Sequence, residues 1–486
     1  MIGIILLSIF LIGMVAIGIW GMKKTTTMSD FFLGGRTIGP WISAFAYGTT
    51  YFSAVIFIGF AGSQGWGFGL NALWIALGNA FIGSCLAWLV LARRTRTMTH
   101  NLNTMTMPEF LCERFGSKAL KITCALIIFI FLVPYSASVF KGLGHLFEVN
   151  FHINYDTALI IMIGITGIYL ILGGYFAVTM TDFIQGFIMI IGSITMILVL
   201  VYKGGGISKV IEDITVNYAK HIPLAKQPSI ITIISLVFMT SFGTWGLPQM
   251  VQKFYAIKND KVIIRAAFIT TCFALIIGFA AYFSGSMTHI FFEPSTLPQA
   301  AGKIDFDKVI PTLLTTHLPE TLMAIILLLI LSASMSTLAS LILVSSSVIT
   351  IDIYQGFINP SISKKNSLLM IRVLSGVFII FSLIVAKFKI AIIVTLMSLS
   401  WGAVAGSLMA PYFYGLFWKR TTKIGAFAGV IAGLITSITL YFTLGAKNAP
   451  LSASIAMVVP FIIVPVFSLL TKRPDEKIIK KAFENI

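Results

Sequence analysis

The segment from Ala333 to Tyr354 reads ASMSTLASLILVSSSVITIDIY and carries a stripe of hydroxyl groups inside a long apolar run. A serine or threonine hydroxyl can hydrogen-bond back to its own helix, so it brings an oxygen ligand into a bilayer at low cost. The pattern is typical either of close helix packing through small residues or of a helix that holds a polar ligand. At helical spacing one face gathers Ala333, Ser336, Thr337, Ser340, Val344 and Ser347, and Asp352 follows near the end.

The composition indicates that lipid surrounds this chain. Of its 486 residues, 57% are hydrophobic and 10% are charged, and the mean hydropathy is +0.96. These values predict an all-α polytopic membrane protein. The formal net charge of +17 comes from basic residues in short loops between apolar runs, where the positive-inside rule places them. The chain is therefore expected to contact a lipid bilayer and no nucleic acid.

The residues that usually carry enzymatic or metal chemistry do not form a recognisable pattern. The cysteines lack CxxC spacing and are expected to be free thiols, and the six histidines do not pair at the spacing of a transition-metal site. There is no HExxH motif and no combination of nucleophile and base. The sequence therefore predicts a protein that is not an enzyme and binds no transition metal.

The apolar runs predict thirteen transmembrane helices, with the N-terminus outside and the C-terminus inside a cell (inner) membrane. In this orientation 24 of the 34 basic residues fall on the cytoplasmic side, as the positive-inside rule requires. The loop from Lys253 to Arg265 is one of these cytoplasmic segments. The predicted spans are 1–22, 37–62, 66–93, 119–147, 155–174, 176–202, 229–250, 264–292, 317–355, 367–387, 389–418, 424–444 and 451–471.

Two groups of five spans begin on opposite sides of the membrane, as in an inverted repeat. The first span of each group is interrupted, by Gly48–Ser53 in one and by Ser241–Pro248 in the other. Unwinding at such places frees backbone carbonyls and amides for a ligand. The expected domains are an extra helix and link at 1–36, repeats at 37–202 and 229–418 around an outer loop at 203–228, and two extra helices with a tail at 419–486.

Several motifs together resemble the sodium:solute symporters, the group of the proline and pantothenate permeases, the sialic acid transporters and the sodium/glucose cotransporters. The resemblance covers nearly the whole chain and implies a leucine-transporter-like core of five plus five inverted helices. The motifs are SDFFLGGR (29–36), MPEFLCERFG (107–116), LGGYFAVTMTDFIQG (172–186), STLAS (336–340), IDIY (351–354) and GLFWKRTTKIGAFAG (415–429).

The resemblance implies a sodium site between the broken first core helix and the eighth core helix. Position by position, the carbonyls would come from Thr49, Phe52 and Ala333, and the hydroxyls from Ser336 and Thr337. A hard monovalent ion prefers several oxygen ligands, and a neutral cage holds it weakly enough to release it. This assignment favours the ligand interpretation of the hydroxyl stripe, with sodium as the bound ion.

A second sodium site occurs in some members of the family, built from an acid on the fifth core helix and three hydroxyls on the eighth. Asp182, Ser336 and Ser340 match three of these four positions, but Ala339 stands at the third hydroxyl position and offers no side-chain oxygen. The sequence therefore favours one sodium per substrate. Asp182 has an alternative interpretation, because a carboxylate at the cytoplasmic start of a membrane helix stabilises the positive helix end.

The resemblance also implies a substrate site beside the sodium carbonyls. A sugar is disfavoured because the sugar transporters carry polar side chains where this chain has apolar ones, and proline is disfavoured because the proline permeases carry an acid where this chain has Tyr51. A small carboxylate or amino-acid-like solute fits best. Lys141 could pair with a carboxylate, or it could extend to the outer interface. The matched residues are Tyr51, Ser53, Ala54, Ile56, Tyr135, Ser136, Trp245 and Trp401.

The predicted function is sodium-coupled import of a small organic solute by alternating access, by a protein that works as a monomer. In this mechanism sodium favours the state that is ready for substrate, and binding of both permits the change to an inward-open state. A proton-coupled or uncoupled transporter of the same fold is the main alternative. A channel is less favoured because no selectivity filter is evident, and a sensor would need an appended signalling domain.

Overall fold

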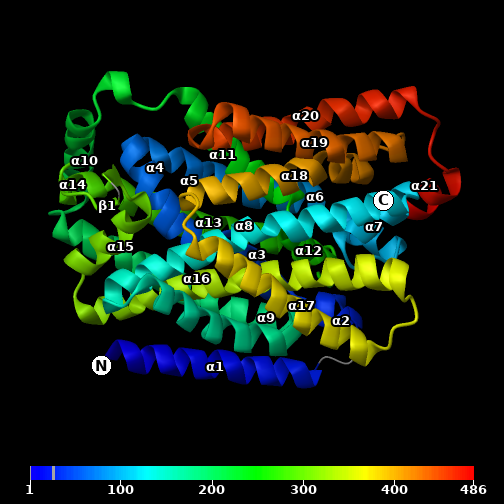
Figure 1. The fold of residues 1–486 in the computed structure, drawn as a ribbon, viewed down its shortest axis with the longest axis horizontal. Helices are drawn as coiled ribbons and strands as arrows, with labels where there is room; N and C mark the ends of the chain where they lie inside the picture. Colours follow the sequence, from blue (N-terminus) through cyan, green and yellow to red (C-terminus); the bar gives the residue numbers. More distant parts are fainter. Residues whose placement is uncertain (1, 25–27, 301, 486) are drawn as a thin grey trace.

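The computed structural model describes residues 2–24, 28–300 and 302–485, and within them the side chains of 2–4, 22, 24, 28, 162, 163, 165–174, 226 and 364 are left aside. The described chain is almost entirely helical (Figure 1). The helices of its first half are α1 (Ile2–Lys24), α2 (Met28–Leu33), α3 (Pro40–Tyr51), α4 (Ala61–Phe68), α5 (Leu73–Gly78), α6 (Ala87–Asn101), α7 (Met107–Phe115), α8 (Lys118–Phe151), α9 (Tyr155–Lys203) and α10 (Ile207–His221).

The second half contains eleven further α-helices and one small antiparallel hairpin, β1 (Gln299–Ala300) with β2 (Lys303–Ile304). Three π-helical stretches join or extend α-helices: η2 (Val55–Phe60), η4 (Asn79–Leu86) and η6 (Val348–Ile358). The α-helices are α11 (Ile230–Gly246), α12 (Pro248–Tyr255), α13 (Lys261–Ser286), α14 (Thr288–Phe291), α15 (Phe306–His317), α16 (Glu320–Ser347), α17 (Lys364–Lys387), α18 (Ile393–Phe417), α19 (Lys423–Leu444), α20 (Ala449–Leu470) and α21 (Glu476–Ala482).

Within the described residues, nine helices are long and apolar enough to cross a membrane, or ten if the bent pair α11–α12 is one span. The prediction of thirteen spans is therefore confirmed only as a multi-pass helical protein. Three predicted spans fall outside this set for separate reasons. The described apolar part of α1 covers only Ile5–Gly21, the span at 37–62 is split after α3, and the span at 155–174 consists largely of residues whose side chains lie outside the description.

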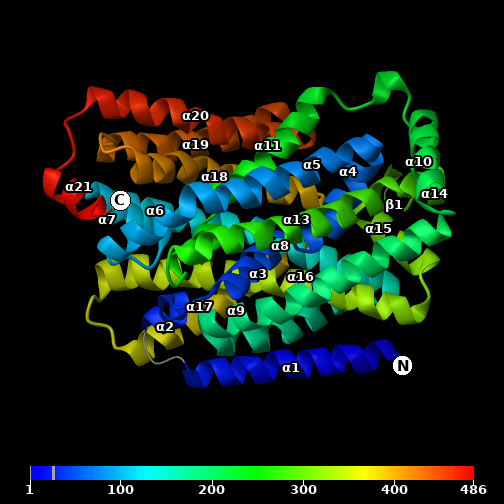
Figure 2. The same cartoon turned by 180° about the vertical axis from the view of Figure 1, so that it is seen from behind.

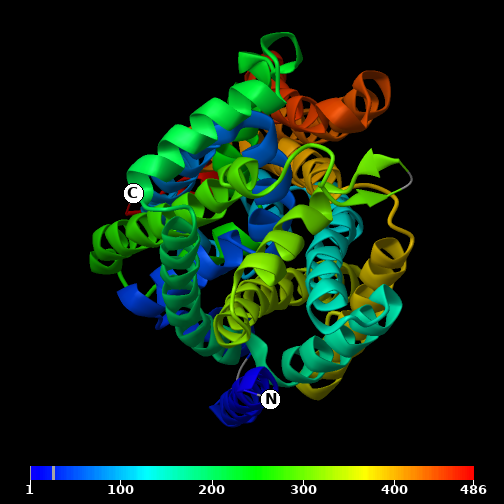
Figure 3. The same ribbon diagram turned by 90° about the vertical axis from the view of Figure 1, so that its left-hand side faces the viewer.

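The long helices run roughly side by side along the longest axis (Figures 1 and 2), and Figure 3 looks along this bundle. The two chain ends lie toward opposite ends of the bundle (Figure 1), which agrees with an odd number of crossings. Helices α10, α14 and α15 and the hairpin cover the end nearer the N-terminus. Which end faces the cytoplasm stays a prediction from the distribution of charge.

Helices α16 and α18 lie at the centre of the bundle. Along their apolar spans 83% and 94% of residues are buried, compared with 28% for α17. Helix α16 packs against α9 and α3, so the hydroxyl stripe faces other helices of the protein. A helix that is apolar and yet buried on all sides can carry polar groups because its neighbours offer hydrogen-bond partners.

Both predicted interruptions are real breaks in the helices. Helix α3 ends at Tyr51, Phe52 is extended at φ −105° and ψ 113°, and helical structure resumes at Val55. Helices α11 and α12 meet at Leu247 with a bend of 47°. Pro248 begins α12, and a proline lacks the N–H that would continue the preceding helix. The local sequence therefore explains the break at Pro248.

Candidate functional site

The predicted sodium ligands meet where α3 ends against the middle of α16. The Ser336 hydroxyl donates to Thr49 Oγ1 at 2.8 Å. The Thr337 hydroxyl lies 3.4 Å from the Thr49 carbonyl, 3.1 Å from the Thr50 carbonyl and 3.1 Å from the Ala333 carbonyl. These side chains are fully buried. The structure thus brings four of the five predicted ligands into one cluster of neutral oxygens.

Phe52, the fifth predicted ligand, forms the extended turn that follows α3. Because its backbone leaves the helix there, its carbonyl is released from the regular i to i+4 ladder. Several neutral oxygens from a helix break and a facing hydroxyl helix are the ligands that a hard monovalent cation prefers. The geometry of this cluster therefore fits a sodium ion as a transported substrate.

The residues proposed for a second sodium site surround a lysine ammonium. Lys253 Nζ of α12 lies 3.1 Å from Ser340 Oγ and 3.5 Å from Asp182 Oδ2. Lys253 is 1% exposed and Asp182 is fully buried. Two interpretations made from the sequence are wrong here: Lys253 is not in a cytoplasmic loop, and Asp182 does not start a helix, since it lies inside α9. The signal in the sequence was a lysine within the short helix PQMVQKFY, directly after the break at Leu247.

A small pocket lies beside the break in α3, and the free space inside it that a water molecule could occupy is only about 20 Å³. Small-molecule sites usually measure about 300–1,000 Å³, so this pocket is nearly closed and has to widen before a solute can enter. Of the predicted substrate residues, Tyr51, Ser53, Ile56, Tyr135 and Trp401 line it. The other lining residues are Phe52, Val55, Phe60, Asn79, Thr240, Tyr282 and Met397.

Aromatic rings shape this pocket, and one of them carries a buried donor without a partner. The Tyr51 ring stacks on Trp401 at 6.5 Å between centroids, and Tyr135 meets Trp401 edge-on at 5.8 Å. The Tyr51 hydroxyl donates to the Thr240 carbonyl at 2.6 Å. Within the described chain Trp401 Nε1 has no hydrogen-bond partner. A buried donor without a partner is costly, so this N–H is a candidate contact for a solute oxygen.

Four predicted substrate residues lie outside this lining, namely Ala54, Ser136, Trp245 and Lys141. The Ala54 methyl group faces Gly142 of α8. Ser136 is fully buried, and its hydroxyl has no partner among the described residues. Trp245 donates to the Ile82 carbonyl at 3.1 Å and stacks on Phe413. The sequence missed Asn79, Thr240 and Tyr282, because a single polar residue in an apolar run does not show which neighbour it faces.

Lys141 does not reach the pocket. Its ammonium binds Asp307 Oδ2 at 2.6 Å and the Ala391 carbonyl at 2.9 Å, and Asp307 also accepts from the backbone N–H of Ile393. Both charged side chains are buried. The interpretation of Lys141 as a carboxylate partner for substrate is therefore wrong, and so is its extension to the interface. It ties α8 to α15 and to the start of α18.

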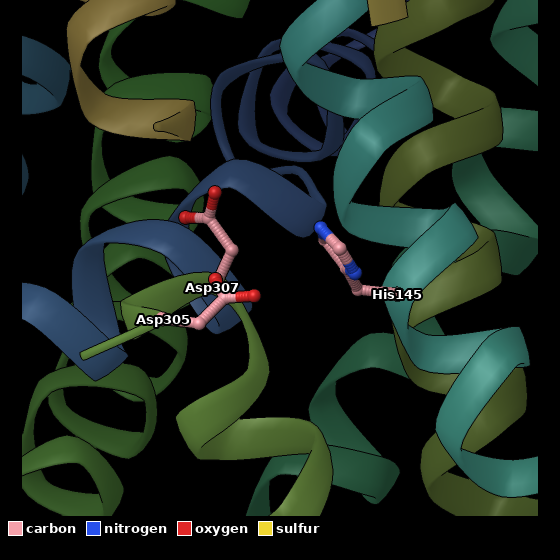
Figure 4. A group of neighbouring side chains, drawn as sticks. All are labelled: His145, Asp305 and Asp307. Atoms are coloured by element: carbon pink, nitrogen blue, oxygen red, sulfur yellow. The ribbon is translucent and has the colours of Figure 1, made fainter. Parts of the chain in front are cut away.

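This ion pair belongs to a larger polar cluster at the same end of the bundle. In Figure 4 His145 of α8 faces the carboxylates of Asp305 and Asp307, and the ligand atoms of these three residues lie within 4.8 Å of one another. His145 also pairs with Glu148 at 3.0 Å. Since the Lys141 ammonium already neutralises Asp307, we interpret the cluster as an ion network that holds α15 against α8.

We expect the Lys141→Met substitution to destabilise the protein by about 3–5 kcal/mol, because it leaves the buried Asp307 carboxylate unpaired. The Lys141→Met/Asp307→Asn variant should recover part of this loss. The melting temperature in detergent measures both effects. The matched control is Lys220→Met, which removes an exposed partner of Glu293 and should leave the melting temperature unchanged. A Lys141→Met variant as stable as wild type would contradict the structural role.

Comparison with known proteins gives a consistent result. The model of the sodium:solute symporter family matches residues 31–433. Two relatives from Bacillus subtilis (strain 168) are the osmoregulated proline transporter OpuE, 30% identical over 97% of this chain and 95% of the relative, and the high-affinity proline transporter PutP, 31% identical over 96% and 97%. The solved structure of a Na+-coupled sialic acid symporter superposes with a TM-score of 0.80 at 21% identity, covering 98% of this chain and 99% of that one.

Proposed function

The chain belongs to the sodium:solute symporter family, and on this basis we propose that it carries a small zwitterionic amino acid into the cell together with one sodium ion. Sodium-coupled symport of a small solute follows from the family and its relatives. It is a transporter and not an enzyme. The fold is the leucine-transporter-like arrangement of its structural neighbours. We further propose thirteen spans with the N-terminus outside, the inner membrane as location, and a monomer as the functional unit.

The absence of charged side chains from the pocket lining carries the proposal for the substrate. The lining residues are aromatic, apolar or neutral polar, so no side chain of the lining can pair with a charged group of the solute, and a solute carboxylate has to pair with the sodium ion instead. A zwitterion has no net charge, and its carboxylate can lie next to the sodium ion. Phe52 connects the two sites, since it lines the pocket and forms the turn at the sodium cluster. Proline is the first solute to test because two relatives are proline transporters.

One sodium per solute supplies enough energy for strong accumulation. One charge that moves through 100 mV contributes about 2.3 kcal/mol, and a tenfold sodium gradient contributes about 1.4 kcal/mol. Together these terms support an accumulation of several hundred-fold. The unwound turn between α3 and η2 is the place where sodium binding can prepare the solute pocket, because Phe52 belongs to both sites.

Uptake of radiolabelled L-proline into proteoliposomes tests this proposal. We expect uptake with an inward sodium gradient and none when choline replaces sodium at fixed pH. Unlabelled amino acids and sialic acid, added as competitors, define the solute class. Uptake that persists in choline and follows the proton gradient would overturn sodium coupling. Competition by sialic acid, without competition by any amino acid, would overturn the substrate class.

The Trp401→Phe substitution keeps an aromatic ring in the pocket and removes the unpartnered N–H. We expect the KM for the solute to rise about 10- to 150-fold, which corresponds to about 1.5–3 kcal/mol for one hydrogen bond to a charged group. The matched control is Trp245→Phe, since Trp245 lies outside the pocket and donates to a backbone carbonyl. Equal KM values for the two variants would remove Trp401 from the solute site.

A further inference from the structure

We propose that the ammonium group of Lys253 is the permanent cation of a second cation site formed by Asp182 and Ser340, so that this chain binds a single sodium ion. This inference rests on the proposed sodium symport and identifies the residue that determines its stoichiometry. Lys253 comes from α12, Asp182 from α9 and Ser340 from α16, so the contacts of these three residues join three helices that are distant in sequence.

The contacts of the ammonium are those expected of a cation in a built site. Its nitrogen lies 3.5 Å from the Asp182 carboxylate and 3.1 Å from the Ser340 hydroxyl. The ring of Tyr175 lies 5.3 Å away and presents its face to the same charge. The three residues that contact the ammonium are at most 2% exposed. Water therefore does not compete with these contacts.

Charge balance argues against a sodium ion in addition to this ammonium. Asp182 supplies one negative charge, and Lys253 already neutralises it. A sodium ion on the same carboxylate would place two positive charges next to each other in a medium of low dielectric constant, where like charges repel strongly. The free Asp182 Oδ1, which has no hydrogen-bond partner within the described chain, shows that the carboxylate itself retains ligand capacity. The Lys253 ammonium therefore excludes a second sodium ion. A lack of oxygen atoms on Asp182 is not the cause.

The same hydroxyl group connects this ammonium to the proposed sodium site. Ser340 Oγ lies 3.0 Å from Thr50 Oγ1, and the Thr50 carbonyl is near the hydroxyl of Thr337. The Lys253 ammonium is therefore one hydroxyl group away from the sodium cluster. Because Lys253 lies on the short helix after the 47° bend, movement of α12 would carry the charge with it, whereas a second sodium ion would have to be bound and released in each cycle.

The experiment counts sodium ions bound to purified protein by equilibrium binding of radioactive sodium, with no solute present. We expect one ion for wild type and one for Ala339→Ser, which adds a hydroxyl but keeps the ammonium. We expect two ions for Lys253→Met/Ala339→Ser, because the Asp182 carboxylate and hydroxyls at positions 336, 339 and 340 are then available to a second ion. Adding Asp182→Asn to this variant should return the count to one, since the second site has lost its charge.

Each other count has a definite meaning. Two ions on wild type, or one ion on a folded Lys253→Met/Ala339→Ser variant, would overturn the role of Lys253. No ion bound to wild type would instead refute the proposed sodium symport. A failure to transport proline would concern only the solute, because the number of bound sodium ions is measured without solute. If Lys253→Met lowers stability, its melting temperature should rise more steeply with sodium concentration than that of wild type. An equal or shallower dependence would also overturn the proposal.

Discussion

Replacing Ser336 and Thr337 together with alanine should abolish sodium-dependent uptake or raise the sodium concentration for half-maximal uptake at least about 100-fold. The two hydroxyls link α16 to Thr49 and Thr50. Each oxygen contact to a charged group contributes about 1.5–3 kcal/mol, and two such losses correspond to a factor of about 100 or more. Initial rates of solute uptake at graded sodium concentrations in proteoliposomes measure this change.

The matched control for this substitution is Ser346→Ala. Ser346 lies on the same helix and is equally buried, but its hydroxyl bonds back to the carbonyls of Ile342 and Leu343. Its loss should leave the sodium dependence unchanged. Thr337→Ser keeps the oxygen and should retain most of the uptake. A double variant that folds and shows the sodium dependence of wild type would eliminate this cluster as the sodium site.

Gly285→Val should prevent correct packing of α4 against α13. A Cβ atom at Gly285 would clash with the carbonyl oxygen of Ala61, and one at Gly65 would clash with the backbone of Gly285. The backbones of α4 and α13 are in direct contact at this crossing, so there is no flexible side chain that could move aside. Overpacking of a core typically costs about 1–3 kcal/mol, and we expect a larger loss here because the helices themselves have to separate.

The elution profile in size-exclusion chromatography and the melting temperature in detergent measure this loss. The control is Gly376→Val in α17, where an added Cβ meets no atom within 4 Å. This variant should elute and melt close to wild type. If Gly285→Val has the same melting temperature as Gly376→Val, then the close approach of α4 and α13 does not contribute to stability.

The sequence predicted the parts of the site that depend on local chemistry. Pro248 lacks an N–H, so it ends the preceding helix wherever that helix packs. Ser336 and Thr337 stand four and three positions before Ser340, so these three hydroxyls lie on one side of any α-helix. Likewise the motif order along residues 29–429 identified the family before any contact was known. These features needed only the residues and the geometry of a helix.

The sequence misassigned the buried lysines because their partners are remote. Lys141 pairs with a carboxylate 166 positions away, and Lys253 pairs with one 71 positions away. A lysine near the end of an apolar run is compatible with a solvated loop, an interface or a buried ion pair. Only the contacts of α8 with α15, and of α12 with α9, distinguish these environments.

The sequence by itself determined that the chain is a multi-pass helical membrane protein, that a helix ends before Pro248, and that the hydroxyls of Ser336, Thr337 and Ser340 share one side of a helix; the family resemblance added which helix they face. Tertiary structure decided which charges neutralise each other and which side chains enclose the solute pocket. The physical reason is the range of the interactions involved. Helix breaks and hydroxyl faces arise between residues a few positions apart, whereas ion pairs and pocket walls exist only after helices from distant parts of the chain have packed together.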